Sequence, residues 1–194
     1  MRREEYLGLK WSDIDFHNRT VCIVRSLKHG KEREGFSWYF GKLKTKMSRR
    51  TIPFTMNLTN MLKAHRRAQN ELRLKLGTAY QNNDLVFASK VGTPFFPENI
   101  RVKWFEPLLK KSGLPDIRLY DLRHTCATLL LLNGINPKVV SERLGHSPVV
   151  MTLDTYSHVL PQMQGEATDS LEMLLFSKKK AVKIDFAHNS HTKQ

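Results

Sequence analysis

Cysteine is nearly absent from this sequence. Cys22 and Cys126 are the only two among 194 residues, and they lie far apart with no C-x-x-C spacing. Disulfide-stabilised domains and cysteine-based zinc sites need more cysteines than this, at closer spacing. We therefore expect no disulfide framework and no cysteine-based zinc site. No cofactor and no other metal is expected either.

Long apolar runs are lacking as well. No stretch approaches the ~20 residues that a membrane-spanning helix requires, and the polar residues at 1–5 do not resemble the start of a signal peptide. We therefore expect a cytoplasmic protein that has no membrane partner.

Acidic residues are scarce relative to basic ones. The chain contains 32 lysines and arginines but 18 aspartates and glutamates, which gives a formal net charge of +14. Such an excess is typical of proteins that bind a polyanion, most often nucleic acid, although charge alone leaves open a ribosome-associated or merely soluble basic protein. Hydrophobic residues make up 40% of the chain, close to the globular norm, so we expect one domain with a buried core.

The first part of the chain predicts a short helix followed by strands. Residues 2–10 favour the helix. Segments 20–24, 36–40 and 50–54 are rich in β-branched or aromatic residues and are bounded by polar ones. We expect these three segments to pair in one small antiparallel sheet, with a charged loop over residues 28–35.

The rest of the chain is predicted to be helical. Apolar residues recur at helical spacing, and prolines and glycines stand where helices begin and end. These signals predict helices over residues 57–76, 97–112, 121–133, 137–145, 148–157 and 165–177. The fold class is therefore α+β, mainly helical with a small three-stranded antiparallel sheet. We expect one folded domain over residues 1–177 and a basic, flexible tail over 178–194.

Five residues in separate segments could together handle a phosphate group without a metal ion: Arg2, Lys44, Arg123, His146 and Tyr156. An arginine donates two parallel hydrogen bonds to a phosphate and does not lose its charge. A tyrosine hydroxyl can attack phosphorus and form a covalent intermediate, and a lysine can protonate the leaving oxygen. This set predicts a phosphoryl-transfer site.

Five segments, in order along the chain, resemble the motifs of the tyrosine recombinase (phage integrase) family. They are residues 2–15, 44–53, 121–125, 144–147 and 152–158. One such motif alone would be a weak signal, but five at compatible spacing identify the chain as similar to the catalytic domain of this family. Family members carry further segments upstream of the first arginine, so we expect residues 1–177 to be an N-terminally truncated catalytic domain.

The resemblance implies a role for each of the five residues. Arg2 and Arg123 would bind the scissile phosphate, and Tyr156 would be the nucleophile. Lys44 would protonate the leaving 5′ oxygen, although the nearby lysines 42 and 46 are alternatives for this role. His146 would contact the phosphate and assist proton transfer.

Supporting residues are expected around these five: Glu5, Tyr120, Asp121, His124 and His158. Glu5 would support the first arginine, and His124 and His158 are interpreted as structural or supporting. The family often has histidine at the position of Tyr120. Tyrosine titrates near ~10 and cannot replace an imidazolium at neutral pH, so the general base is not identified.

The function that the resemblance implies is site-specific recombination of double-stranded DNA. The enzyme would cut one strand through a 3′-phosphotyrosine intermediate and rejoin it to another strand, as in integration or excision of a mobile element, and would self-associate as a tetramer on DNA. Two alternatives remain open: strand relaxation like that of a type IB topoisomerase, and a catalytically inactive DNA-binding remnant.

An apolar stripe in the last helix is formed by Ala167, Leu171, Leu174 and Leu175. It is interpreted as core packing, and docking on a neighbouring protomer is the alternative.

Overall fold

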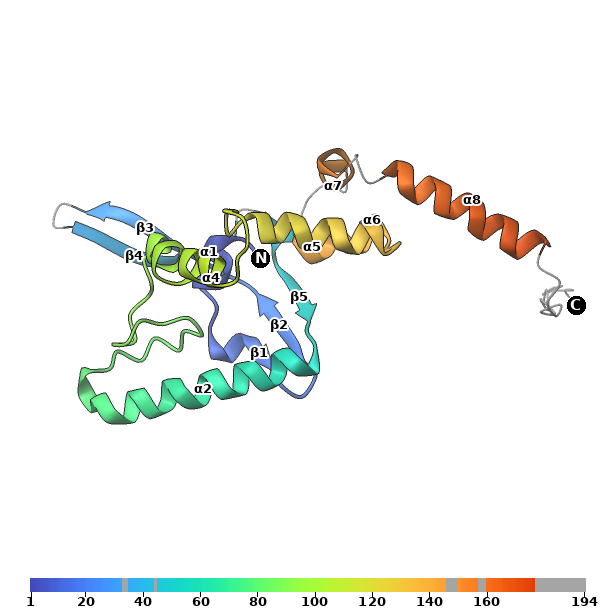
Figure 1. Ribbon diagram of the computed structural model, residues 1–194. Coiled ribbons are helices and arrows are strands. Elements are labelled where there is room, and N and C mark those ends of the chain that lie inside the picture. The colour runs from blue at the N-terminus through green and yellow to red at the C-terminus, as the bar shows by residue number, and fades with distance from the viewer. Residues whose placement is uncertain (33–34, 44, 146–149, 157–159, 177–194) are drawn as a thin grey trace, which may run out of the picture.

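The computed structural model describes residues 1–32, 35–43, 45–145, 150–156 and 160–176 (Figure 1). Its helices are α1 (Arg3–Leu7), α2 (Met56–Leu76), α3 (Pro97–Ile100), α4 (Glu106–Lys111), α5 (Asp121–Leu132), α6 (Pro137–Leu144), α7 (Val150–Thr155) and α8 (Leu160–Phe176). Its strands are β1 (Ile14–Asp15), β2 (Thr20–Ile23), β3 (Ser26–Glu32), β4 (Gly35–Gly41) and β5 (Arg50–Pro53). The mainly helical α+β class predicted from the sequence is confirmed.

The strands form two antiparallel units rather than one. The first is a three-stranded sheet in the order β1-β2-β5, and the second is the hairpin β3–β4, in which Lys28 lies opposite Tyr39. The predicted sheet therefore has the right number of strands but one wrong member. Segment 36–40 is a strand as predicted, yet it pairs with β3, and most of the expected loop over 28–35 is that strand.

The helix limits follow local signals. The Thr55 hydroxyl accepts a hydrogen bond from the Leu58 amide at the start of α2. Asn136 caps α6 in the same way, with Pro137 in its first turn, and Gly145 ends α6 in the left-handed conformation. The expected helix over 97–112 is interrupted by a π-helical turn at Arg101–Phe105.

Two apolar clusters form the core. One lies around the three-stranded sheet and contains Leu9, Trp11, Ile14 and Val86. The other joins α5, α6 and the end of α7, and contains Ala127, Leu131, Val140, Leu144 and Tyr156. Figure 1 shows α2 on one side of the sheet and α5 with α6 on the other. The second cluster fixes the position of Tyr156, the residue predicted to be the nucleophile.

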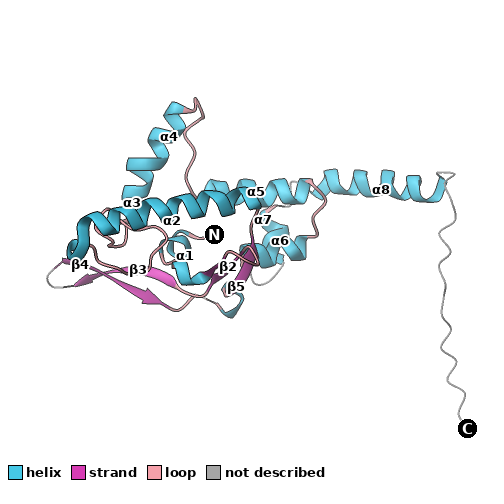
Figure 2. Cartoon of the chain, turned by 90° about the horizontal axis from the view of Figure 1, so that it is seen from below, coloured by secondary structure: helices cyan, strands magenta, loops and turns pink. Residues whose placement is uncertain are grey.

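Helix α8 extends away from the rest of the molecule in both views (Figures 1 and 2). Leu171, Leu174 and Leu175 are 55%, 82% and 66% exposed. The interpretation of these leucines as core packing is therefore wrong. Apolar residues at helical spacing indicate that one face of a helix packs against another surface, but they do not identify that surface.

None of the helices in the described part of the chain combines the length and apolarity that a bilayer crossing requires.

Candidate active site

Three arginines from distant segments each donate a hydrogen bond to the C-terminal end of α6. The bonds run from Arg50 Nε to the Arg143 carbonyl (2.8 Å), from Arg123 Nη2 to the Leu144 carbonyl (2.5 Å) and from Arg2 Nη2 to the Gly145 carbonyl (2.9 Å). The last carbonyls of a helix lack partners within the helix and carry the negative end of its dipole. Three consecutive carbonyls therefore bring three guanidinium groups together.

Glu5 links two of these arginines. Its carboxylate accepts hydrogen bonds from Arg2 Nη1 at 3.0 Å and from Arg50 Nη2 at 2.8 Å. The Glu5 side chain is 3% exposed. Burial raises its pKa, but hydrogen bonds from Arg50 and Arg2 outweigh this and hold the pKa below its usual value. The structure thus places an ionised Glu5 beside Arg2, where the resemblance suggested it.

Arg50 was given no role in the sequence analysis. Its side chain is 7% exposed and donates to Glu5, to the Arg143 carbonyl and to the Ser48 carbonyl. The signal was present in the two-residue period of β5: the side chains of Arg50 and Ile52 point inward, while Thr51 between them is exposed. A buried arginine on the inner face of a strand must have polar partners.

Gly145 is needed for this arrangement. Its φ of +67° lies in the left-handed region, and a Cβ at this position would lie 2.7 Å from Arg50 Nη1. Any other residue would therefore be strained and would also displace the guanidinium group of Arg50.

Arg123 is buried, with 5% of its surface exposed. Its Nη2 binds the Leu144 carbonyl, but its Nη1 has no hydrogen-bond partner among the described residues. Burial lowers the pKa of Arg123, and the nearby positive charge of Arg2 lowers it further. A buried cationic donor without a partner is costly, so this position suits an anion.

Tyr156 is 2% exposed and packs in the cluster between α5 and α6. Its hydroxyl lies 2.9 Å from His124 Nδ1. Burial raises the pKa of Tyr156, and the charge of Arg123 opposes this shift. The phenol is therefore protonated at neutral pH, and it lies within the electrostatic field of Arg123.

The other predicted site residues are distributed differently. Tyr120 is half-exposed, and its ring packs edge-on against His124 with 5.1 Å between ring centroids. Asp121 forms an ion pair with the exposed Arg118, at 3.0 Å, and does not contact the arginine cluster through any hydrogen bond found among the described residues. Lys44, His146 and His158 lie outside the described residues.

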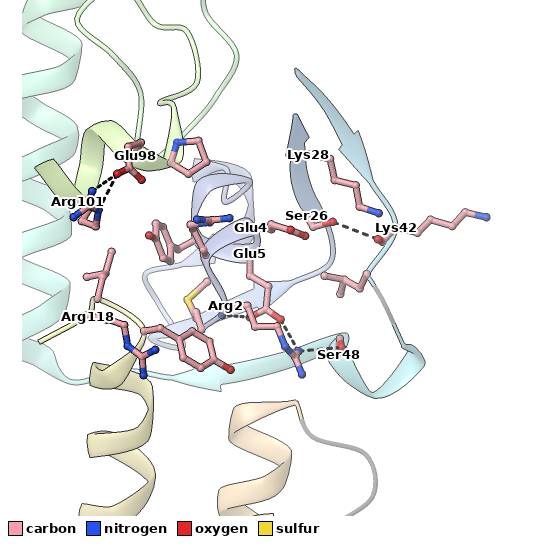
Figure 3. Close-up of a pocket in the computed structure, with 17 residues that line it drawn as sticks. Arg2, Glu4, Glu5, Ser26, Lys28, Lys42, Ser48, Glu98, Arg101 and Arg118 are labelled. Carbon is pink, nitrogen blue, oxygen red and sulfur yellow. Dashed lines mark hydrogen bonds and ion pairs between the residues drawn. The ribbon is translucent and has the colours of Figure 1, made fainter. Parts of the chain in front are cut away.

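A cavity of about 660 Å³ opens beside Arg2 (Figure 3). Its basic lining residues are Arg2, Arg3, Lys28, Lys42, Arg101 and Arg118, and its acidic ones are Glu4, Glu5 and Glu98. Figure 3 shows Lys28 and Lys42 on one side of the cavity and Arg101 and Arg118 on the other. The excess of cations suits a polyanion. No group of three His, Cys, Asp or Glu side chains that could hold a metal ion occurs in the part of the chain that the structure describes.

Comparison with solved structures identifies the fold. The Tn1549 transposon integrase, in complex with transposon right end DNA, matches with a TM-score of 0.71 and 24% identity over 88% of this chain and 55% of that chain. The XerA recombinase matches with a TM-score of 0.60 and 24% identity over 86% of this chain and 53% of that chain. The described architecture is therefore the fold of these recombinases.

Comparison with known sequences identifies the family. A tyrosine recombinase XerC-like protein of Caldanaerobacter subterraneus subsp. tengcongensis is 36% identical over 90% of this chain and 46% of its own length. The ICEBs1 integrase of Bacillus subtilis is 32% identical over the same shares. The chain thus spans about half the length of the curated relatives it matches. The phage integrase family matches residues 1–163, and the chain belongs to that family.

Proposed function

We propose that this chain acts as the catalytic domain of a tyrosine site-specific recombinase, which cuts and rejoins double-stranded DNA through a covalent 3′-phosphotyrosine. The observation that carries the proposal is the buried Arg123, whose Nη1 lacks a partner among the described residues and whose charge acts on Tyr156. An anion-binding guanidinium beside a tyrosine hydroxyl is the arrangement that this chemistry requires. Relatives named integrases, such as that of ICEBs1, support integration or excision of a mobile element.

The proposed reaction assigns one step to each residue. The guanidinium of Arg2 donates three hydrogen bonds to described residues. A guanidinium has five N–H groups, so two are left over in this part of the chain for the scissile phosphate, together with those of Arg123. The oxygen of Tyr156 bonds to phosphorus as the bond from phosphorus to the 5′ oxygen breaks. Lys44 protonates that oxygen, and His146 contacts the phosphate. The phosphotyrosine conserves the bond energy, so a 5′ hydroxyl of another strand can reverse the attack.

We further propose that residues 1–177 form one catalytic domain and that the basic residues 178–194 form a tail. The family match over residues 1–163 supports the first part, and residues 177–194 lie outside the described part of the chain. We propose a cytoplasmic location as well, because the proposed substrate is DNA.

A suicide DNA substrate tests the function. A nick near the cleavage site lets the short cut strand diffuse away, so the covalent complex accumulates and is seen on a denaturing gel. We expect a protein–DNA band with the wild-type chain at low salt, and exchange of strands between two duplexes. Relaxation of supercoiled plasmid without exchange would indicate the topoisomerase alternative, and absence of any band would indicate the DNA-binding remnant.

Binding to duplex DNA should weaken steeply with salt. If the six basic residues that line the cavity each neutralise a phosphate, log K falls with a slope of about −0.9 per contact, or about a thousandfold between 50 and 200 mM salt. Fluorescence anisotropy at several salt concentrations measures the slope. Replacing Lys28 and Arg118 with glutamine should reduce it by about two contacts, whereas Lys75→Gln, outside the cavity, should not change it. A slope near zero would contradict this prediction.

We also propose that α8 docks on a neighbouring protomer in a tetramer on DNA. Its leucines 171, 174 and 175 are exposed, and exposed apolar surfaces of this kind mark interaction sites.

Leu171→Ser with Leu174→Ser should therefore abolish assembly on DNA while single-protomer binding survives, as measured by sedimentation velocity with and without a duplex. Met173 is 72% exposed but lies on another face of the helix at about 100° per residue, so Met173→Ser is the matched control. If the leucine double variant and Met173→Ser reduced assembly on DNA equally, the leucine stripe would have no specific partner.

A further inference from the structure

His124 and Tyr156 are in direct contact across α5 and the end of α7. His124 Nδ1 lies 2.9 Å from the Tyr156 hydroxyl, and the ring centroids are 5.8 Å apart. A general base must lie within about 2.6–3.2 Å of the group whose proton it accepts. Of the described residues, His124 therefore meets this geometric requirement for the proton of the proposed nucleophile.

The reaction needs such a base. Burial raises the pKa of Tyr156, and the charge of Arg123 acts in the opposite direction, so the attacking oxygen carries a proton that must leave. Tyr120, three residues before Arg123, is a phenol and cannot accept a proton near neutral pH. The ring of Tyr120 instead packs edge-on against His124, which restricts the orientation of the imidazole.

We propose that His124 is a catalytic residue whose Nδ1 accepts the phenolic proton of Tyr156 as the tyrosine oxygen attacks the scissile phosphorus. The inference rests on the proposed function. The O–H bond of Tyr156 breaks and an N–H bond forms on His124, while the oxygen–phosphorus bond forms and the bond to the 5′ oxygen breaks. The 5′ oxygen takes its proton separately, from the general acid. When a 5′ hydroxyl reverses the attack, His124 returns its proton to the departing tyrosine oxygen.

The charged and titratable groups around the pair fit this role. Arg123, Tyr120 and Cys126 act on Tyr156. Asp121 lies one turn before His124 on the same helix; the pKa of Asp121 is lowered mainly by its hydrogen bonds from Arg118 and to a smaller extent by His124. The Asp121 carboxylate is thus held mainly by Arg118.

The kinetic test isolates the attack step. A suicide substrate with sulfur in place of the leaving 5′ oxygen releases a thiolate that needs no general acid, so its cleavage rate still reports the base but no longer the acid. At saturating protein, we expect His124→Gln to lower this rate by about 10²–10⁴-fold. His124→Ala should regain part of the rate when imidazole is added. His17→Gln, a change in an exposed turn, is the control and should match the wild type.

A spectroscopic measurement supports or overturns the inference without DNA. Nitrogen-15 NMR of the wild-type chain should show that the neutral form of His124 carries its proton on Nε2, because Nδ1 must be free to accept. A proton on Nδ1 would overturn the inference. A wild-type rate for His124→Gln on the sulfur substrate would also overturn it and leave the proposed function intact. If the wild type forms no adduct with any substrate, the proposed function and this inference fall together.

Discussion

Replacing Tyr156 with phenylalanine should abolish the covalent protein–DNA complex. The change removes the one atom that attacks phosphorus and keeps the ring, which fills the cluster between α5 and α6. Loss of a nucleophile lowers the rate by at least about a thousandfold in enzymes of this type. Denaturing gels of a suicide-substrate reaction measure the loss directly.

Folding and DNA binding should survive the same change. The hydrogen bond between the hydroxyl and His124 is worth about 1 kcal/mol. Tyr156 is 2% exposed, so it adds little to any DNA-binding surface. Thermal unfolding and anisotropy titrations of the variant should therefore resemble those of the wild type. A covalent band formed by Tyr156→Phe would mean that another residue is the nucleophile.

Glu5→Ala should be among the most destabilising single changes in the chain. It leaves Arg50, which is 7% exposed, as a buried cation without its carboxylate partner, and breaking a buried pair in this way costs about 3–5 kcal/mol. For a domain of this size, that loss lowers Tm by roughly 10 °C or more. Circular dichroism during heating or urea titration provides the measurement.

Matched variants separate this effect from the loss of an ordinary ion pair. Glu98→Ala removes an exposed carboxylate that pairs with Arg101, and it should destabilise the fold far less than Glu5→Ala because water screens an exposed pair. Glu5→Leu with Arg50→Met removes both charges and should recover much of the loss. Equal stability of Glu5→Ala and Glu98→Ala would contradict the prediction.

The effect should also depend on pH. Because the pKa of Glu5 is lower in the folded chain than its ordinary value of 4.5, its stabilisation is complete above that value and is lost as the pH falls through the folded pKa. The difference in stability between wild type and Glu5→Ala should accordingly shrink in acid.

The helices were predictable because their limits depend on local chemistry. Gly134 and Gly145 both adopt positive φ, and Pro137 has the fixed backbone angle of a first turn, so the ends of α5 and α6 are determined within a few residues. The segments carrying Arg2, Arg123 and Tyr156 were recognised for a similar reason: each motif is short and contiguous.

Strand pairing and the contacts of Arg50 were not predictable in the same way. The sequence of β3 contains no β-branched residue, so it becomes a strand through its pairing with the aromatic β4 rather than through its own propensity. Arg50 is buried because Glu5 and the end of α6 approach it from segments 45 and 93 positions away. Contacts between segments so far apart in the sequence are determined by the tertiary structure, so no local pattern predicts them.

The end of α6 also determines how the site can respond to movement. Three consecutive carbonyls at the end of this helix hold three arginines. Two of them, Arg2 and Arg123, are proposed to bind phosphate, and the third, Arg50, shares Glu5 with Arg2. A rotation or shift of α6 would therefore act on all three side chains at once. Because Glu5 also holds two of them, the same movement would be transmitted to α1, so the geometry of the phosphate-binding arginines depends on how these two helices are placed relative to each other.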